Sequence, residues 1–242
     1  MNDKDKYCGV PDSAAVCADC LYKSEGLFKV FYQQTDVAKW RAAWCSLLLN
    51  TDYIRFFSNA TLQEYTKAFP VLDNNKCVVV DPHDVDIRFN EKYAVKNNDN
   101  VMRLGVFGFI DKHKGSAVVL DLVEAIKARQ ETIEIHVFGS LNGISTGSDD
   151  VLKMHGPYKR ENIVKILNEN EINIVLMPSI CPETFSFVTA ELLDTNVDVM
   201  TFDLGAQADL TNSKSNGYVV PLFSDVPLID HVVEVVRNKL NA

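Results

Sequence analysis

Glu183 and Glu191 are two carboxylates eight positions apart within the segment 178–191, whose sequence is PSICPETFSFVTAE. Ser186 lies between them and is a suitable N-cap, which predicts a helix over 187–194. Glu183 then lies in the loop before this helix, and Glu191 about one and a half turns into it. The two side chains therefore flank a helix N-terminus, where free backbone amides and the helix dipole favour an anion.

This spacing suits an elongated ligand. Five helical residues rise about 7.5 Å, so the two carboxylates could bind the two ends of a ligand whose anionic middle rests on the helix N-terminus. A nucleotide sugar has this shape, because its hydroxyl-rich ends suit carboxylate acceptors and its diphosphate suits the free amides. The pattern predicts a nucleotide-sugar site around these residues.

Four further motifs accompany the two glutamates. They are VFGFIDKHKGS at 106–116, MHGPYKRENI at 154–163, FDLGA at 202–206 and NGYVVP at 216–221. They resemble, in turn, the glycine loop ending in Lys-Gly, the Gly-x-(Tyr/Val) loop and the last two loops of retaining GT-B-fold glycosyltransferases, of the family-four or group 1 type in the bacterial polysaccharide branch. A pair of glutamates alone would be a weak signal, whereas five motifs in order are a strong one. The resemblance covers residues 101–242.

The resemblance implies a reaction and a set of partners. It implies transfer of a hexosyl group from a nucleoside-diphosphate sugar to a glycan or lipid-linked acceptor, with retention at the anomeric carbon, in cell-surface polysaccharide synthesis. No cofactor is required for this chemistry. Such sites stabilise an oxocarbenium-like transition state and use the leaving phosphate to help deprotonate the acceptor, so Glu183 would bind the sugar rather than attack it.

The resemblance also assigns roles to single residues. Lys114 would neutralise the departing diphosphate and is, with Glu183, a predicted catalytic residue. The predicted nucleotide-binding residues share positions at strand or helix ends: Gly108, Gly139, Tyr158, Phe185, Ser186 and Glu191. Glu191 would accept hydrogen bonds from ribose hydroxyls, and Tyr158 would contact the base. The alternatives are a solvated surface lysine for Lys114 and an ordinary turn aromatic for Tyr158.

One position departs from the family pattern. Phe109 stands directly after the loop glycine, where many relatives carry an arginine as a second cation for the diphosphate. The supply of cations is therefore thinner than in those relatives. His113 is a candidate to compensate in part, although a lone histidine in a loop is more often an ordinary polar residue.

Composition indicates an ordinary globular protein. The 242 residues are 47% hydrophobic and 24% charged, and no stretch of eighteen apolar residues occurs. Met1 to Lys6 are not followed by the apolar core of a signal peptide, so we expect a cytoplasmic protein, with the inner face of the membrane as a second location. The formal charge of −9 argues against nucleic acid as a partner.

Three of the six cysteines are close in sequence. Cys8, Cys17 and Cys20 form C-x8-C-x2-C, and the close pair has a spacing at which one turn can present two thiolates to zinc. No fourth ligand is evident. The sequence leaves two hypotheses, a structural zinc site and a loop with free thiols.

The order of elements predicts an α/β fold. Residues 101–242 alternate strands and helices, which predicts a doubly wound parallel sheet, a Rossmann-like GT-B donor domain with ligands at the carboxyl ends of the strands. Residues 27–100 predict an α-β-α-β order and a linker, which would be a partial acceptor domain. Residues 1–26 predict an irregular cysteine-bearing segment that resembles a CG-x-P…C-x-x-C insert of some polysaccharide glycosyltransferases.

The segment 37–49 predicts a helix. Its apolar residues on one face are Val37, Trp40, Trp44, Leu47 and Leu48. We expect this stripe to pack inward; peripheral membrane association is the alternative. The first strands of an acceptor domain have no counterpart, so the chain resembles a truncated enzyme. Two other functions therefore stay open, a non-catalytic nucleotide-sugar-binding fragment and a structural interaction domain with zinc.

Overall fold

The computed structural model describes residues 2–4, 6–11, 13–24, 29–80, 89, 91–94, 100–144 and 149–240. Its larger sheet has six parallel strands. In chain order they are β3 (Met102–Ile110), β4 (Ile133–Leu141), β5 (Leu152–Gly156), β6 (Ile174–Met177), β7 (Asp198–Phe202) and β8 (Gly217–Val220). Their order in the sheet is β5-β4-β3-β6-β7-β8. Successive strands are added outward on one side of β3 and then, from β6 on, outward on the other side, as in a doubly wound sheet. The predicted α/β architecture is confirmed.

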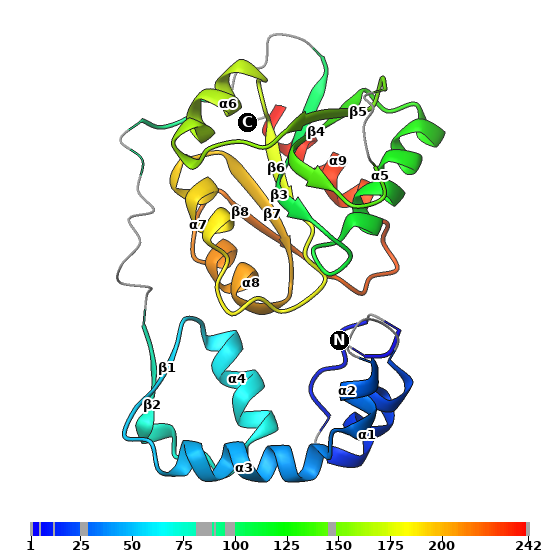
Figure 1. Cartoon of the computed structure of the whole chain (residues 1–242). Coiled ribbons are helices and arrows are strands. Elements are labelled where there is room, and N and C mark those ends of the chain that lie inside the picture. Colours follow the sequence, from blue (N-terminus) through cyan, green and yellow to red (C-terminus); the bar gives the residue numbers. More distant parts are fainter. Residues whose placement is uncertain are drawn as a thin grey trace.

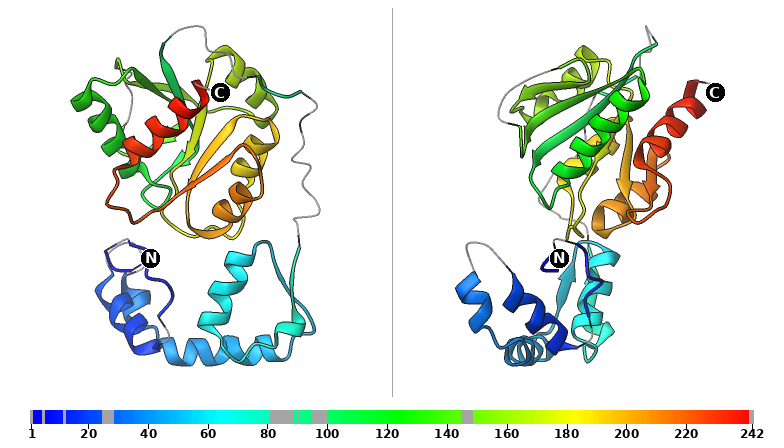
Figure 2. Two further views of the ribbon diagram at one scale, coloured as in Figure 1. Left: turned by 180° about the vertical axis from the view of Figure 1, so that it is seen from behind. Right: turned by 90° about the vertical axis from the view of Figure 1, so that its right-hand side faces the viewer.

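Helices cover both faces of this sheet. Those of the described residues are α5 (Ser116–Arg129), α6 (Ile163–Glu169), α7 (Phe187–Asp194), α8 (Gly205–Asn212) and α9 (Leu228–Leu240), with a short 3-10 turn η2 (Arg160–Asn162) before α6. Apolar side chains of α5 and α9 pack in one cluster, and those of α6 and α7 in another. Figure 1 views the molecule from the side of α7 and α8, and the left-hand view of Figure 2 from the side of α9.

Helix α8 was not predicted from the sequence. Its buried side chains are Ala206, Gln207, Ala208 and Thr211. Two of the four are polar, so no apolar stripe marks the helix in the sequence.

The connection from β4 to β5 contains no helix among its described residues. The polar residues Glu134, His136, Lys153 and His155 alternate with apolar residues along these two strands. Parallel strands are usually covered on both faces and consist of continuous apolar runs. The alternation fits a sheet face that no crossover helix covers.

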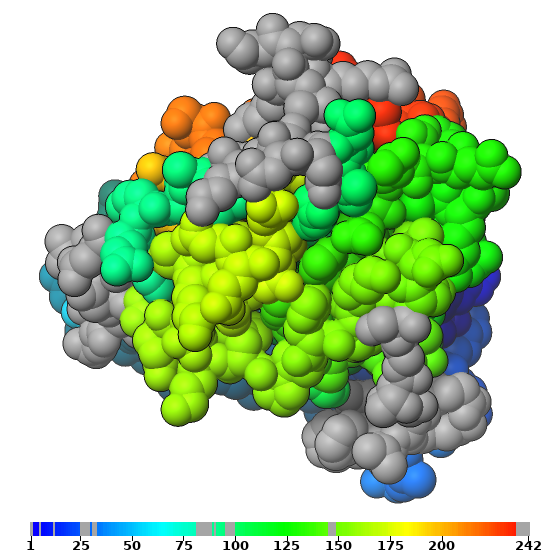
Figure 3. All heavy atoms as spheres, turned by 90° about the horizontal axis from the view of Figure 1, so that it is seen from above, coloured from blue at the N-terminus to red at the C-terminus, as the bar shows by residue number. Residues whose placement is uncertain are grey.

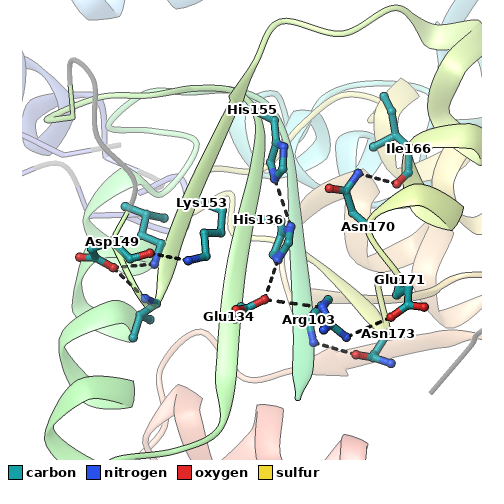
Figure 4. A network of polar contacts seen from close by, with 12 residues as sticks. Arg103, Glu134, His136, Asp149, Lys153, His155, Ile166, Asn170, Glu171 and Asn173 are labelled. Carbon is teal, nitrogen blue, oxygen red and sulfur yellow. Dashed lines mark hydrogen bonds and ion pairs between the residues drawn. The ribbon is translucent and has the colours of Figure 1, made fainter. Parts of the chain in front are cut away.

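Figure 4 shows the polar chain on this face. His155 Nε2 lies 3.1 Å from His136 Nδ1, and His136 Nε2 lies 3.2 Å from a Glu134 carboxylate oxygen. Glu134 pairs with Arg103 at 3.6 Å, and Arg103 pairs with Glu171 at 3.4 Å. Burial lowers the pKa of both histidines. The neutral rings are therefore favoured, and the ring that accepts the hydrogen bond between the two imidazoles must be neutral.

The first eighty residues contain a separate two-stranded parallel sheet, β1 (Ile54–Phe56) and β2 (Cys77–Val79). The helices of this part are α1 (Ala14–Lys23), α2 (Lys29–Gln34), α3 (Val37–Leu49) and α4 (Asn59–Ala68), with a 3-10 turn η1 (Asn74–Lys76). Phe56, Tyr65 and Phe69 pack α4 against β1, with successive ring centroids 5.2 and 6.0 Å apart. The predicted α-β-α-β order is confirmed. Of the predicted linker, which spans 88–100, residues 88, 90 and 95–99 lie outside the described residues, as do residues 81–87 before it.

The prediction that residues 1–26 are irregular is wrong for α1. This helix has no buried residue, so no apolar periodicity predicts it from the sequence. An ion pair between Lys23 and Asp19, four positions apart at 2.6 Å, lies on its surface and is of a kind that stabilises helices.

The prediction that the α3 stripe packs inward is also wrong in large part. Val37 and Leu48 are buried, but Trp40, Trp44 and Leu47 are 52%, 41% and 57% exposed. The two tryptophan rings contact each other instead, with centroids 6.0 Å apart. The two-stranded sheet is covered by α4, and α3 runs along the lower edge of this part of the molecule in Figure 1. None of the described helices is long and apolar enough to cross a membrane.

Candidate functional site

The loop between β3 and α5 places Lys114 at the carboxyl edge of the sheet. Within this loop the Lys114 amide donates to Asp111 Oδ1 at 2.9 Å, and the Ser116 amide donates to the Asp111 carbonyl at 3.0 Å. Gly115 has φ of +84°, and a Cβ there would lie 1.9 Å from the carbonyl oxygen of Pro178. Only glycine permits this turn. The loop therefore packs directly on the end of β6.

Lys114 meets Glu183 across this edge. The Lys114 Nζ lies 2.7 Å from Glu183 Oε1, and the two side chains are 41% and 11% exposed. A cavity of about 390 Å³ lies here, and its lining includes Gly108, Phe185 and Ser186. The structure thus brings together five of the predicted site residues from two separate segments of the chain.

Two strand-end glycines leave this edge open. Gly108 on β3 and Gly139 on β4 are paired in register. A Cβ on Gly139 would lie 1.9 Å from the Gly108 carbonyl oxygen, and both residues have positive φ. Phe109, at the expected position of a second cation, is 72% exposed and lines the cavity. The cation supply is therefore as thin at this loop as the sequence indicates.

Ser186 occupies the N-cap position of α7, as predicted, but its side chain makes no capping hydrogen bond. Its hydroxyl lies 2.8 Å from the Thr189 hydroxyl instead. The first backbone amides of α7 are therefore not occupied by this side chain, and they lie beside the cavity that Ser186, Phe187 and Val188 line. Such amides favour an anion.

Glu191 lies further along α7 and is buried, with 7% of its surface exposed. Its Oε1 accepts a hydrogen bond from Arg160 Nε at 2.6 Å. Burial raises the pKa of Glu191, and the Arg160 guanidinium opposes this shift. Burial and the Glu191 charge together raise the pKa of Tyr158 to about 12, so the Tyr158 hydroxyl stays protonated and available as a donor.

Tyr158 joins the two groups of residues. Its ring packs edge-on against Phe107, with centroids 5.4 Å apart, and Phe107 lines the cavity that Lys114 and Glu183 face. Tyr158 also lines a second cavity of about 560 Å³ between α6 and the end of β5. In the space-filling view of Figure 3, α6 lies at the surface beside the β4 and β5 region. The predicted residues therefore form two neighbouring clusters at one edge.

No protein-family model and no curated protein match the chain. Solved structures do match. Alr3699/HepE from Anabaena in complex with UDP has a TM-score of 0.64 and 15% identity, over 86% of this chain and 60% of that chain. The lipopolysaccharide outer core galactosyltransferase WaaB has a TM-score of 0.60 and 14% identity, over 78% of this chain and 54% of that chain. A glycosyltransferase from Rickettsia africae has a TM-score of 0.59 and 14% identity, over 95% of this chain and 71% of that chain.

The chain has the fold of the GT-B glycosyltransferases. At these identities the likeness shows the fold alone. The chain spans 54% of the WaaB chain and 40% of the chain of TarM, another matched solved structure with a TM-score of 0.61 and 13% identity. The residue roles in this GT-B domain therefore stay predictions, which the clustering of the side chains supports.

Two residues of the GT-B domain were missed by the sequence analysis. Gln207 on α8 is fully buried; its Oε1 accepts from the Glu183 amide at 3.1 Å, and its Nε2 donates to the Cys181 carbonyl at 2.9 Å. Arg160, which binds Glu191, is the other. The FDLGA motif directly precedes Gln207 and was the signal that could have found it, whereas nothing local marks Arg160.

The three candidate zinc ligands lie close to one another: burial raises the pKa of the Cys20 thiol, and Cys8 and Cys17 are near enough to contribute to this shift. Cys17 and Cys20 lie on α1, and Cys8 lies in the segment before it; all three are free thiols. Cys17 Sγ accepts from Arg41, and Cys20 Sγ accepts from the Asp3 amide. Among the described residues no group of three or more histidine, cysteine, aspartate or glutamate side chains is placed to bind a metal ion. The zinc site and the free-thiol loop therefore both stay open as hypotheses, and elemental analysis of the purified protein distinguishes them.

Proposed function

We propose that this GT-B chain transfers a hexosyl group from a nucleoside-diphosphate sugar to a glycan or lipid-linked acceptor, with retention of configuration. The observation that carries the proposal is the ion pair of Lys114 and Glu183, 2.7 Å apart, which shares its cavity with Ser186 at the N-terminus of α7. A cation and free helix amides suit a diphosphate. A carboxylate beside them suits the sugar hydroxyls.

Each proposed role follows from the chemistry of the side chain. Lys114 would neutralise charge on the departing diphosphate, and the first amides of α7 would donate to the same group. Glu183, with Oε1 already bound by Lys114, would accept from sugar hydroxyls through its remaining lone pairs. Glu191 would accept from the ribose. These groups supply charge stabilisation without a metal, so we propose no required cofactor.

Nucleotide binding is the first test. Calorimetric titration with UDP, GDP and dTDP should identify at least one that binds the intact chain. Glu191→Ala should weaken that binding by about 1.5–3 kcal/mol, because a charge-assisted pair of hydrogen bonds to ribose is lost. Unchanged affinity in this variant would remove the role of Glu191, and a failure of all three nucleotides to bind would contradict the proposal.

A non-catalytic nucleotide-sugar-binding module is the second candidate. Two observations favour it. The sheet of the described N-terminal part has only two strands, and the chain spans 40% of the TarM chain and 71% of the Rickettsia africae glycosyltransferase chain. Alignment of acceptor with donor contributes about 7–11 kcal/mol to well-oriented reactions. We therefore expect the isolated chain to bind nucleotide but to transfer little sugar. Saturable transfer to a defined acceptor would contradict this expectation.

The cellular setting stays part of the proposal. A role in cell-surface polysaccharide synthesis, at the inner face of a membrane, requires a surface that contacts lipid or a lipid-linked acceptor. The exposed face of α3, with Trp40, Trp44 and Leu47, is compatible with such contact, since tryptophan prefers the membrane interface.

A further inference from the structure

Arg160 is the cation that reaches Glu191 in the part of the chain that the structure describes. It opens η2, directly after the loop that contains Tyr158, whereas Glu191 lies on α7, 31 positions later in the chain. The ion pair has an N–O distance of 2.6 Å, and the side chains are 43% and 9% exposed. Arg160 therefore approaches the carboxylate from the more exposed side.

The other polar groups near Glu191 leave one carboxylate oxygen available. Tyr158 faces Glu191 closely enough for the glutamate charge to raise the tyrosine pKa. Lys92 is occupied with Asp194, one turn further along α7, at 2.8 Å. Glu191 Oε1 is bound by Arg160, and Glu191 Oε2 has no hydrogen-bond partner among the described residues. Glu191 Oε2 is not fully enclosed by protein atoms, so this acceptor is accessible to a ligand hydroxyl at the surface of a largely buried side chain.

Phe89 contacts the Arg160 side chain. The Arg160 guanidinium lies over the Phe89 ring, 5.1 Å from its centroid, which is a cation–π distance. The Phe89 amide donates to Asp194 Oδ2 at 2.7 Å, and the Tyr93 amide donates to the Thr195 carbonyl at 2.7 Å. Phe89 and Tyr93 are thus hydrogen-bonded to the C-terminal end of the helix that carries Glu191, and the Phe89 ring lies against Arg160.

We infer that Arg160 is a positioning residue of the donor site: it binds Oε1 of Glu191 and so directs Oε2 to the ribose hydroxyls of the nucleotide, while Phe89 fixes the guanidinium. This inference rests on the proposed function and deepens it. Ribose hydroxyls need a carboxylate acceptor in one orientation. A buried carboxylate without a cation tends to take up a proton and then offers fewer acceptor sites. Arg160 holds the Glu191 carboxylate in one orientation and favours its ionised form, without contact with the nucleotide.

The first test is a pair of ligands that differ only in the ribose. Arg160→Gln should weaken binding of the tightest-binding ribonucleoside diphosphate about tenfold. It should leave binding of the matching 2′,3′-dideoxynucleoside diphosphate almost unchanged, because the hydroxyls that Glu191 binds are then missing. Arg160→Lys, which keeps the charge but not the planar fork, should restore part of the affinity. Equal losses for both ligands would mean that Arg160 contacts the base or phosphate and would overturn the inference.

Arg129→Gln is the matched control. Arg129 on α5 forms an ion pair with Asp230 on α9, on the other face of the sheet, so this variant also breaks an arginine–carboxylate pair. It should leave nucleotide affinity unchanged. Phe89→Leu should weaken ribonucleotide binding about threefold in the wild type and have little effect in the Arg160→Gln background, because the two residues act through one contact. Additive effects would contradict the proposed support by Phe89.

The pH dependence of binding separates positioning from a purely structural role. Glu191 must be ionised, so nucleotide affinity should fall as the pH drops through the pKa of its carboxyl. Loss of Arg160 raises that pKa further, so in Arg160→Gln the fall should begin at a higher pH than in the wild type. An unchanged profile, with circular dichroism that shows a folded variant, would overturn the inference alone. A wild-type chain that binds no nucleoside diphosphate would overturn the proposed function together with it.

Discussion

Glu183→Gln is expected to tighten the binding of a bare nucleoside diphosphate and to weaken the binding of the sugar-bearing donor. In the free protein the Glu183 carboxylate lies 2.7 Å from Lys114 Nζ, and its side chain is only 11% exposed. A diphosphate that binds Lys114 therefore approaches a carboxylate that repels it. Glutamine keeps the size of the side chain and one acceptor oxygen but removes the charge, so the repulsion disappears.

The size of the effect follows from Coulomb's law. Two unit charges about 6 Å apart interact by roughly 1.4 kcal/mol at an effective dielectric constant of about 40. Because Lys114 is 41% exposed, screening lowers this to about 1 kcal/mol, which is about fivefold in Kd. The sugar hydroxyls lose a charged acceptor in the same variant. The preference for the sugar-bearing donor over the bare diphosphate should therefore fall about tenfold.

Titration calorimetry with the nucleoside diphosphate and its hexose ester measures both effects. Glu124→Gln is the matched control, because it removes the same charge from α5, where the Glu124 side chain is 78% exposed. The gain in diphosphate affinity should shrink as salt concentration rises. The geometry in which the diphosphate shares Lys114 with Glu183 is refuted if Glu183→Gln binds the diphosphate no better than Glu124→Gln does.

Two further variants test the framework of the site. Gly115→Ala should lower the free energy of unfolding by more than the ~1–2 kcal/mol of a left-handed backbone, because its Cβ would lie 1.9 Å from a backbone oxygen. Gly143→Ala is the control, since with φ of +94° and its nearest atom at 3.5 Å it has the same backbone strain without the clash. Equal melting temperatures of the two variants would contradict the prediction. Asp149 accepts from Lys127 and two backbone amides, which lower its pKa to about 2 from 3.8. A depressed folded pKa contributes stability above pH 3.8 that is lost as the pH falls toward 2. Asp149→Ala should therefore lower the urea midpoint at pH 7, relative to the wild type and to Asp150→Ala, by an amount that shrinks below pH 4; a constant difference would show that the charge is not involved.

The main features of the GT-B domain could be predicted from the sequence because they depend on local patterns. The apolar run before Pro178 forms β6, and the segment 187–194 forms α7. Glu183 and Glu191 lie in the loop and in the helix as their spacing indicates. Proline, glycine and apolar periodicity act over a few residues, so the chain itself contains these signals.

Other features depend on neighbours that no local pattern reveals. Arg160 pairs with Glu191 across 31 positions of sequence. Polar Gln207 is buried because a loop amide donates to its Oε1 and a carbonyl accepts from its Nε2. The tryptophans of α3 show the opposite case. Trp40 and Trp44 have the spacing of core residues, but whether such a stripe is covered depends on which elements lie opposite it.

The loop that carries Glu183 is also where the N-terminal part contacts the domain with the six-stranded sheet. Thr61 Oγ1 on α4 donates to the Thr184 carbonyl at 3.3 Å, and the Phe57 ring lies 6.5 Å from that of Phe185. These contacts adjoin Glu183 on one side, and Lys114 binds it on the other. A shift of α4 would therefore act first on the carboxylate proposed for the sugar, and only through α7 on the ribose end of the site. We accordingly expect the acceptor to approach from α4, where the transferred sugar would lie between it and the diphosphate.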